Sequence, residues 1–318
     1  MTTSLNKNIY RQIKESSIPI FYQPWWLDIV CGKENWEVSI VTEKDGHITS
    51  VLPYYIPRFL GFRVIRMPPL TPFLGVWLDT PTSHTESSNI FYSEYFKVKK
   101  LIDQLPKTIW YHQIHPYQFK YGLPFSQSYF KLSIRCTFII ENEPLDLIFE
   151  NFHKSLKKNI RKAADSYEIK ASSDVNICLK LIKQTFLDRR EKFSISEGKF
   201  LMLSKYIINK KSGIVLYACD KKTQITVASQ FLLWDNFHVY TWFAGLDRKA
   251  NANRGAPALL IWEAIKIANS MNRSLNFCGS MIAGVAAFNA SFGAKLVPVF
   301  QIKKCSSKLI EFLKDLIE

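Results

Sequence analysis

A run of cations between residues 154 and 162 is the first feature of the sequence that suggests chemistry. The run contains Lys154, Lys157, Lys158, Arg161 and Lys162. Residues three and four apart share a side of a helix, so these cations gather opposite an apolar stripe. Like charges on one side repel each other, and a phosphate-bearing ligand would relieve that repulsion. We predict phosphate contact by the first four of these cations, with a solvated basic surface as the alternative.

A second anion site is predicted between Arg248 and Pro257, where a strand is expected to give way to a helix. The segment reads Arg-Lys-Ala-Asn-Ala-Asn-Arg-Gly-Ala-Pro. A helix start offers free backbone N–H groups and a favourable dipole to an anion. Arg254 adds a planar charge and Gly255 permits close backbone approach. We predict that Arg254, Gly255 and Ala256 bind donor phosphates, the alternative being an ordinary polar loop.

Four side chains are candidates for proton transfer or for contact with the reacting atoms. They are Asp79, Tyr240, Cys278 and Ser280. General acid–base catalysis needs a group of suitable pKa near the acceptor, and no constellation in the sequence demands one. Because alignment of two reactants accelerates a reaction by itself, this does not argue against catalysis. The alternative for each of the four is a structural role.

The pair His112 and His115 raises the question of a zinc site. We expect a strand over these residues, and residues three apart on a strand face opposite sides. No cysteine or acidic residue stands at ligand spacing nearby. We therefore predict no metal site here.

Composition and charge limit the class of protein. The chain has 318 residues, which suggests about two domains, and its 47% hydrophobic and 22% charged residues exclude disorder. No stretch approaches the roughly 18 apolar residues of a membrane span, and the polar start lacks a secretory signal. Six scattered cysteines fit reduced thiols in a cytoplasmic protein. A net charge of +15 favours anionic partners, phosphorylated small molecules and tRNA among them.

The apolar periodicity predicts the same kind of fold twice. The second half is expected to run strand, two helices, three strands, helix, strand, helix, strand, with strands over residues 167–171, 214–220, 224–234, 237–246, 275–278 and 296–303. The first half has a shorter version of this order. We predict two domains, residues 1–141 and 142–318, and a terminal helix from Ser307 to Glu318.

Three segments match motifs of one known group of proteins. Residues 156–163 contain an N-I-R-x-A core on a basic helix. Residues 258–268 and 275–280 are similar to a helix and strand that usually end in F-D-F-x-G, and residues 288–293 are similar to F-K-x-x-F-G. The chain thus resembles the FemAB-type transferases and related GNAT-superfamily proteins with tandem GNAT domains, from about Phe21 to Lys303.

The resemblance implies an α/β (α+β) fold of two tandem GNAT-like acyltransferase domains, each a mixed, mostly antiparallel sheet flanked by helices. It implies that the helix expected over Pro257 to Ser270 presents its N-terminus, at Arg254–Pro257, to the pyrophosphate of an acyl-CoA. Cys278 and Ser280 would then lie at the strand end where this fold places its reaction centre. Residues 75–79 are similar to a G-P-x-x-D segment, without its proline, which implies a general base at Asp79.

The expected function is transfer of an acyl group from acyl-CoA, a cosubstrate, to an amine acceptor by direct aminolysis. The second domain would hold the donor and the degenerate first domain would shape the acceptor cleft. An aminoacyl-tRNA-dependent FemAB-type transferase acting on a cell-wall precursor is an alternative. Asn289 disfavours it, because this amide stands where the peptide-bridge transferases carry a lysine. A second alternative is a non-catalytic ligand-binding protein on the same fold.

Overall fold

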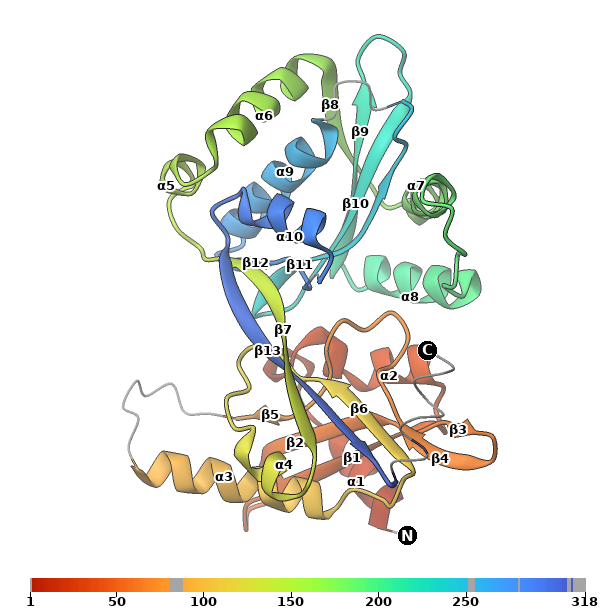
Figure 1. The fold of residues 1–318 in the computed structure, drawn as a ribbon, viewed down its shortest axis with the longest axis vertical. Coiled ribbons are helices and arrows are strands. Elements are labelled where there is room, and N and C mark those ends of the chain that lie inside the picture. The colour runs from red at the N-terminus through yellow and green to blue at the C-terminus, as the bar shows by residue number, and fades with distance from the viewer. Residues whose placement is uncertain (1, 80–87, 251–254, 280, 308–309, 311–318) are drawn as a thin grey trace. The chain divides into compact units, whose positions relative to one another are not determined.

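The chain divides into two compact units. The computed structural model describes residues 2–79, 88–250, 255–279, 281–307 and 310. One unit, the N-terminal unit, comprises residues 1–135 together with the chain from Pro298 on, and the C-terminal unit is Cys136–Val297. Both are visible in Figure 1. No helix in the described part of the chain is long and apolar enough to cross a membrane.

The N-terminal unit combines two sheets with helices. Its helices are α1 (Thr2–Tyr10), α2 (Pro24–Cys31), α3 (Ser88–Asp103) and α4 (Leu123–Gln127), with 3-10 turns at Glu15–Ser17 and Ile20–Tyr22. Its strands are β1 (Trp36–Thr42), β2 (Ile48–Tyr55), β3 (Arg58–Phe59), β4 (Phe62–Ile65), β5 (Trp77–Leu78), β6 (Trp110–Ile114), most of β13 (Lys295–Cys305) and the first half of β7 (Lys131–Ile140). One sheet has the order β1-β2-β5, and in the other the strands of this unit have the order β3-β4-β6-β13-β7.

The end of the chain belongs to a different unit from the one predicted. We expected residues 142–318 to form one domain, but β13 pairs antiparallel with β6, from Gln301 opposite Ile114 to Cys305 opposite Trp110. Ile302 is fully buried in the N-terminal core, which explains why the strand returns there. The predicted helix from Ser307 to Glu318 lies outside the described residues, apart from two of its members.

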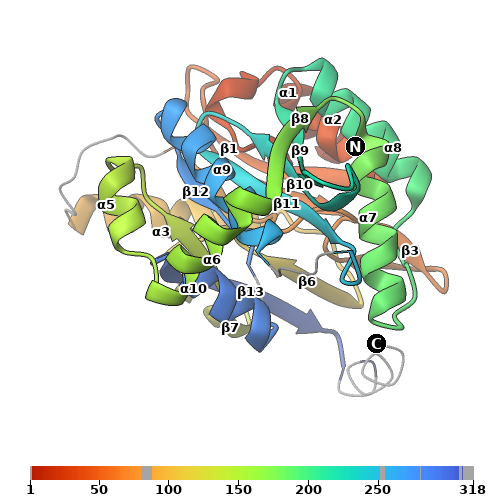
Figure 2. The same ribbon diagram turned by 90° about the horizontal axis from the view of Figure 1, so that it is seen from above.

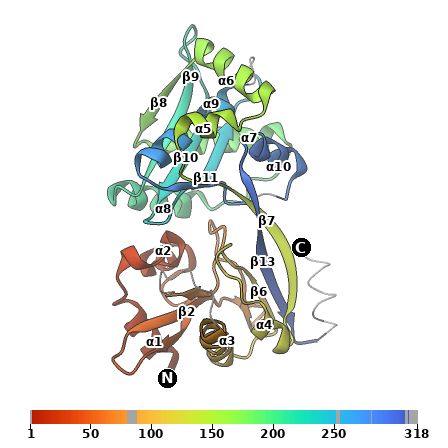
Figure 3. The same ribbon diagram turned by 90° about the vertical axis from the view of Figure 1, so that its left-hand side faces the viewer.

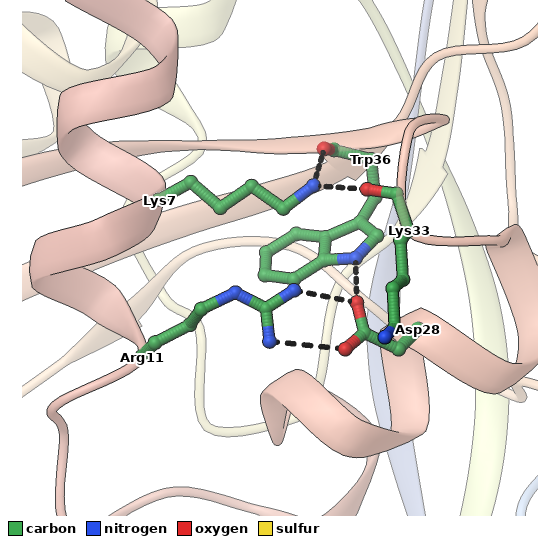
Figure 4. Close-up of polar contacts among 5 residues, drawn as sticks. All are labelled: Lys7, Arg11, Asp28, Lys33 and Trp36. Atoms are coloured by element: carbon green, nitrogen blue, oxygen red, sulfur yellow. Dashed lines mark hydrogen bonds and ion pairs between the residues drawn. The ribbon is translucent and has the colours of Figure 1, made fainter.

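A polar and aromatic cluster joins the first elements of the N-terminal unit (Figure 4). The Trp36 indole N–H donates to Asp28 Oδ1 at 2.8 Å, and Arg11 donates to both oxygens of Asp28 at 3.0 and 2.8 Å. Lys7 Nζ lies 4.2 Å from the Trp36 ring centroid and donates to the Trp36 carbonyl. Desolvation lowers the pKa of Lys7. The cluster therefore ties α1, α2 and β1 together.

The C-terminal unit has one twisted sheet between two layers of helices. Its strands are the second half of β7, β8 (Tyr167–Ser172), β9 (Gly213–Asp220), β10 (Thr226–Trp234), β11 (His238–Leu246) and β12 (Ser274–Asn276), in the order β7-β12-β11-β10-β9-β8. Its helices are α5 (Leu145–Glu150), α6 (Lys154–Ser166), α7 (Val175–Asp188), α8 (Glu197–Asn209), α9 (Ala256–Ser270) and α10 (Ala283–Ala290). The predicted order of elements from residue 167 to 292 is confirmed.

The sheet is antiparallel from β8 to β11, and β12 is parallel to β11. Helix α9 covers one face with α6 beside it, while α7 and α8 cover the opposite face (Figures 1 and 2). Gly245 allows α7 to approach β11, since a Cβ at this residue would lie 2.5 Å from the Ile182 backbone nitrogen. The apolar stripe of α6 is buried in the core that α9 shares. These contacts place both predicted phosphate-binding elements on the same side of the sheet.

Candidate functional site

The parallel pair β11 and β12 opens at its carboxyl end. The two strands are paired from His238 opposite Ser274 to Tyr240 opposite Asn276. Strand β12 then ends, whereas β11 continues to Leu246. Among the described strands, none pairs with this side of β11 beyond Tyr240. Leu246, the last residue of β11, uses its N–H and carbonyl on the Thr185 hydroxyl. The part of β11 just beyond Tyr240 therefore presents the backbone groups that a ligand can use as hydrogen-bond partners.

A bulge in β11 lies at the same place. Phe231 of β10 is opposite Phe243, and the next residue of β10 is opposite Thr241, so Trp242 is the extra residue. A bulge bends the strand and increases its local twist, and such bulges are common beside active sites. The bulge at Trp242 therefore explains why β11 bends away from β12 beyond Tyr240.

The crossover from β11 to β12 places a helix start at this end of the sheet. Helix α9 connects the two parallel strands, so its N-terminus lies at their carboxyl ends, where open α/β units bind ligands. Gly255 has no side chain with which to cap the first N–H groups of α9, and Pro257 lacks an N–H. The Ala256 and Ala258 amides are the first peptide groups of the helix. Arg254 lies outside the described residues.

The basic helix α6 packs beside the start of α9. A Cβ on Gly255 would lie 2.7 Å from the Ala163 Cβ and 3.0 Å from the Asn159 carbonyl oxygen. Glycine at 255 therefore permits the contact between the two helices. The structure brings together the two elements that the sequence marked as anion sites.

The cations of α6 do not all face α9. Each residue turns a helix by about 100°, so Asn159 and Ala163 mark the flank that contacts Gly255. Lys162 is the cation nearest that flank, and Arg161 lies on the opposite flank. Lys157 donates to the Glu150 carbonyl at 2.8 Å, at the end of α5. Lys154, Lys158 and Arg161 are exposed.

The structure adds information at two of these positions, while the phosphate contacts themselves stay a prediction. Lys157 caps the carbonyl end of α5, and its Nζ lies 5.8 Å from the centroid of the Phe149 ring. These contacts hold the start of α6 against α5. Lys162, which was outside our predicted contact set, is the cation best placed toward α9. The sequence shows that Lys162 stands three residues after Asn159. Only the structure shows that Asn159 lies against Gly255, at the start of α9.

Tyr240 is anchored at the point where the strands separate. Its phenol is buried and donates to Asp235 Oδ2 at 2.8 Å. Asp235 Oδ1 accepts from the backbone N–H groups of Phe237 and His238 at 2.8 and 3.0 Å. Burial lowers the pKa of the His238 imidazole to about 4. The sequence names Tyr240 as a candidate, but the bond from its phenol to the Asp235 carboxylate is visible only in the structure.

Cys278 lies just beyond the end of β12 in a left-handed backbone conformation, with φ of 60°. Its N–H donates to Asn276 Oδ1 at 2.8 Å. Burial, with a contribution from the Asp235 carboxylate, raises the pKa of the Cys278 thiol well above its ordinary value. The group is therefore a neutral thiol at neutral pH and a poor nucleophile. Ser280 lies outside the described residues.

Asn276 fixes the end of β12. It is 1% exposed, and its Oδ1 also accepts from Thr137 Oγ1 at 3.0 Å. An aspartate would make the same bonds only by burying a negative charge, which is costly without a cation. The neutral amide at a position where the FemAB group often has aspartate therefore suits this buried setting.

Asp79 belongs to the N-terminal unit, whereas the other candidates belong to the C-terminal unit. Its Oδ2 lies 2.8 Å from His47 Nε2, and the two side chains are 44% and 56% exposed. The backbone N–H of Asp79 donates to the Thr49 carbonyl, which holds β5 near β2. A carboxylate beside an imidazole is a reasonable acid–base pair, and its role stays a prediction.

Comparison with known proteins identifies the fold. No protein-family model and no curated protein sequence matches the chain. Among solved structures, FemX matches with a TM-score of 0.63 and 11% identity, over 95% of this chain and 96% of FemX. A C-terminal domain described as that of a lysylphosphatidylglycerol synthetase, from Agrobacterium fabrum, matches with a TM-score of 0.55 and 12% identity, over 99% and 95% of the two chains.

L-PGS from Bacillus licheniformis matches with a TM-score of 0.53 and 12% identity, over 90% of this chain and 89% of that one. At such identities the similarity concerns the fold alone. The chain has the mixed α/β fold of these solved structures, so the predicted α/β fold class is confirmed.

Proposed function

We propose that the protein is an N-acyltransferase whose C-terminal unit holds a phosphate-bearing acyl donor, with acyl-CoA as that donor. The observation that carries the proposal is the open edge of β11 beyond Tyr240, at the same end of the sheet as the α9 N-terminus. An extended acyl carrier can pair with such an edge while its phosphates meet the helix start.

In the proposed reaction, the acceptor amine attacks the thioester carbonyl carbon. The C–N bond forms, the C–S bond breaks, and the CoA sulfur leaves as a thiolate that takes up the proton lost by the amine. Backbone N–H groups of β11 near the bulge would polarise the carbonyl. The raised pKa of the Cys278 thiol disfavours a covalent acyl-cysteine intermediate, which supports direct transfer.

Lys162 supplies the sharpest test of the donor site. Lys162→Glu places an anion on the α9 side of α6, whereas Arg161→Glu makes the same charge change on the opposite flank. We expect the first variant to weaken coenzyme A binding by on the order of tenfold and the second to have little effect. Equal weakening by both would indicate attraction by net charge alone and would contradict a site at α9.

The first measurement is a thermal-shift titration with coenzyme A, with ATP as a control of similar charge. Ligand at 100 times its Kd stabilises a protein by about 2.7 kcal/mol, enough to raise Tm by several degrees. A shift with coenzyme A alone, followed by turnover of acyl-CoA with pooled amines, is the expected result. Binding without turnover would instead identify a non-catalytic ligand-binding protein.

Aminoacyl-tRNA is the second candidate donor, in a FemAB-type reaction on a cell-wall precursor. The net charge of +15 and the similarity in fold to FemX favour it. Buried Asn289, which is 4% exposed, supplies no cation to such a reaction. Transfer from aminoacyl-tRNA that weakens steeply with salt, without any effect of coenzyme A, would select this donor.

A further inference from the structure

The N-terminal unit carries an exposed aromatic surface on α3. Phe91, Tyr92 and Phe96 are 45%, 61% and 54% exposed. Their rings and that of Tyr95 form a continuous cluster: Tyr92 stacks on Phe96 at 6.5 Å, Tyr95 meets Phe96 edge-on at 5.2 Å, and Phe91 lies 6.2 Å from Tyr95. Isolated exposed apolar residues are ordinary, but a contiguous exposed patch marks an interaction surface.

The rings of Tyr92 and Phe96 do not pack into the core of the unit. Val98 and Leu101 of α3 are fully buried and define its core-facing side. At about 100° per residue, Phe96 lies almost opposite Val98, and Tyr92 lies on the same outer flank as Phe96. These aromatic side chains therefore point away from the interior of the unit.

The segment around α4 extends the patch. Phe91 lies 6.0 Å from Tyr121, and the Tyr95 hydroxyl donates to Gln127. Leu123, at the start of α4, is 51% exposed. Helices α3 and α4 lie side by side in two perpendicular views (Figures 1 and 3). We call the rings of Phe91, Tyr92, Tyr95, Phe96 and Tyr121, with Leu123, the α3–α4 surface.

The chain segment that contains this surface is rich in cations. Residues 88–135 contain seven cations, Lys97, Lys99, Lys100, Lys107, Lys120, Lys131 and Arg135, and two acidic residues, Glu94 and Asp103. Glu94 is 5% exposed, and Asp103 is paired with Lys99 at 2.7 Å. Lys100 is exposed and stands one helical turn after Phe96, on the same side of α3. The charge beside the exposed rings is thus complementary to an anionic partner.

We propose that the α3–α4 surface docks reversibly onto an anionic lipid bilayer. Aromatic rings prefer the boundary between headgroups and acyl chains, and lysines next to them attract lipid phosphates. Tyr92 and Phe96 enter that boundary, while Lys100 and Lys120 meet the headgroups. This inference is independent of the donor site, since a catalytically inactive protein would dock equally well.

The test is sedimentation with two kinds of vesicle. One contains phosphatidylcholine alone, and the other contains phosphatidylcholine with about 30% phosphatidylserine, which gives the membrane a negative surface potential. We expect binding to the anionic vesicles only, weakening as salt rises. Tyr92→Ser combined with Phe96→Ser should reduce binding at least about tenfold. Lys100→Glu combined with Lys120→Glu should abolish the preference for anionic vesicles.

The matched control is Leu187→Ser combined with Met202→Ser, at two exposed apolar positions of the C-terminal unit that are 70% and 57% exposed. This variant should bind vesicles like the unaltered protein, and all variants should keep its Tm. Equal loss of binding in the control, or no binding to anionic vesicles, would overturn the proposal. A dimer in sedimentation velocity that only the Tyr92 and Phe96 variant disrupts, without vesicle binding, would assign the surface to a second copy instead.

Discussion

At the scale of single residues, this protein relies on buried and half-buried polar side chains that are hydrogen-bonded to their neighbours. Asp28 accepts three bonds from Trp36 and Arg11, and Asn276 accepts from Thr137 and the Cys278 backbone. A lost partner leaves a donor or acceptor without water to replace it, which costs more than the bond itself contributes. Such residues are expected to be sensitive to substitution even where they do no chemistry.

Asp28→Ala tests this at the cluster of Figure 4. The change leaves the buried Trp36 indole N–H without its acceptor, so we expect a loss of about 1–3 kcal/mol in the free energy of unfolding. Asp103→Ala is the control, because its pair with Lys99 is exposed and should contribute less than about 1 kcal/mol. Urea denaturation measures both, and equal losses would contradict the structural role of the cluster.

Buried histidines predict how stability depends on pH. Burial lowers the pKa of His115 to about 3 and that of His238 to about 4, from 6.5. Below pH 6.5 the unfolded chain binds protons that the folded protein does not, so stability falls as pH decreases toward 4. Each histidine contributes up to about 1.4 kcal/mol per pH unit. His115→Phe should therefore make the slope between pH 6 and 4 shallower, and an unchanged slope would refute this assignment.

At the scale of elements, close approach between backbones decides where helices lie. Gly245 lets α7 contact β11, and Gly255 lets α6 contact the start of α9. Neither contact leaves room for a Cβ, so both helices are placed by glycines on the neighbouring element. The second contact brings the cationic helix to the helix start that lies at the same end of the sheet as the open edge of β11.

Gly245→Ala should destabilise the protein by about 1–3 kcal/mol, because the added Cβ would lie 2.5 Å from backbone atoms of α7 that cannot move aside easily. Gly198→Ala in α8 is the matched control. Nothing lies within 4 Å of a Cβ there, so this change should stabilise the helix by up to about 1 kcal/mol. Thermal unfolding of the two variants should move Tm in opposite directions.

At the scale of the whole molecule, the two units do not follow the order of the chain. The N-terminal unit is completed by a strand from the end of the sequence, and β7 and β13 each contribute residues to both units. Loss of the contacts that β13 makes should therefore destabilise the N-terminal unit, although β13 follows the C-terminal unit in the sequence.

Ile302→Ala tests this division. Ile302 is fully buried in the N-terminal core, so we expect a loss of about 2–5 kcal/mol in stability. Hydrogen exchange should show the loss of protection in β6 and not in β10. Leu296→Ala, at a residue of β13 that is 57% exposed, is the control and should leave exchange unchanged. Loss of protection confined to β10 would mean that β13 stabilises the C-terminal unit instead.

The sequence by itself determined the local elements and the fold class. Apolar periodicity predicted α6, α7, β10 and β11, which the structure contains. The spacing of cations on α6 predicts an anion-binding helix, which stays a prediction. These features depend on residues close together in the chain, whose side-chain directions follow from helix and strand geometry. The motif segments then predicted the GNAT-like fold that the comparisons support.

The tertiary structure alone decided which of these features meet. Ile302 enters the core of the first unit, Lys162 rather than Arg161 is the cation nearest the α9 flank, and the Tyr240 phenol is bonded to Asp235. Each depends on a contact between residues or elements whose relative placement periodicity does not encode. The pattern of apolar residues along the chain predicts which side of an element is buried. The residues that this side packs against are known only from the tertiary structure.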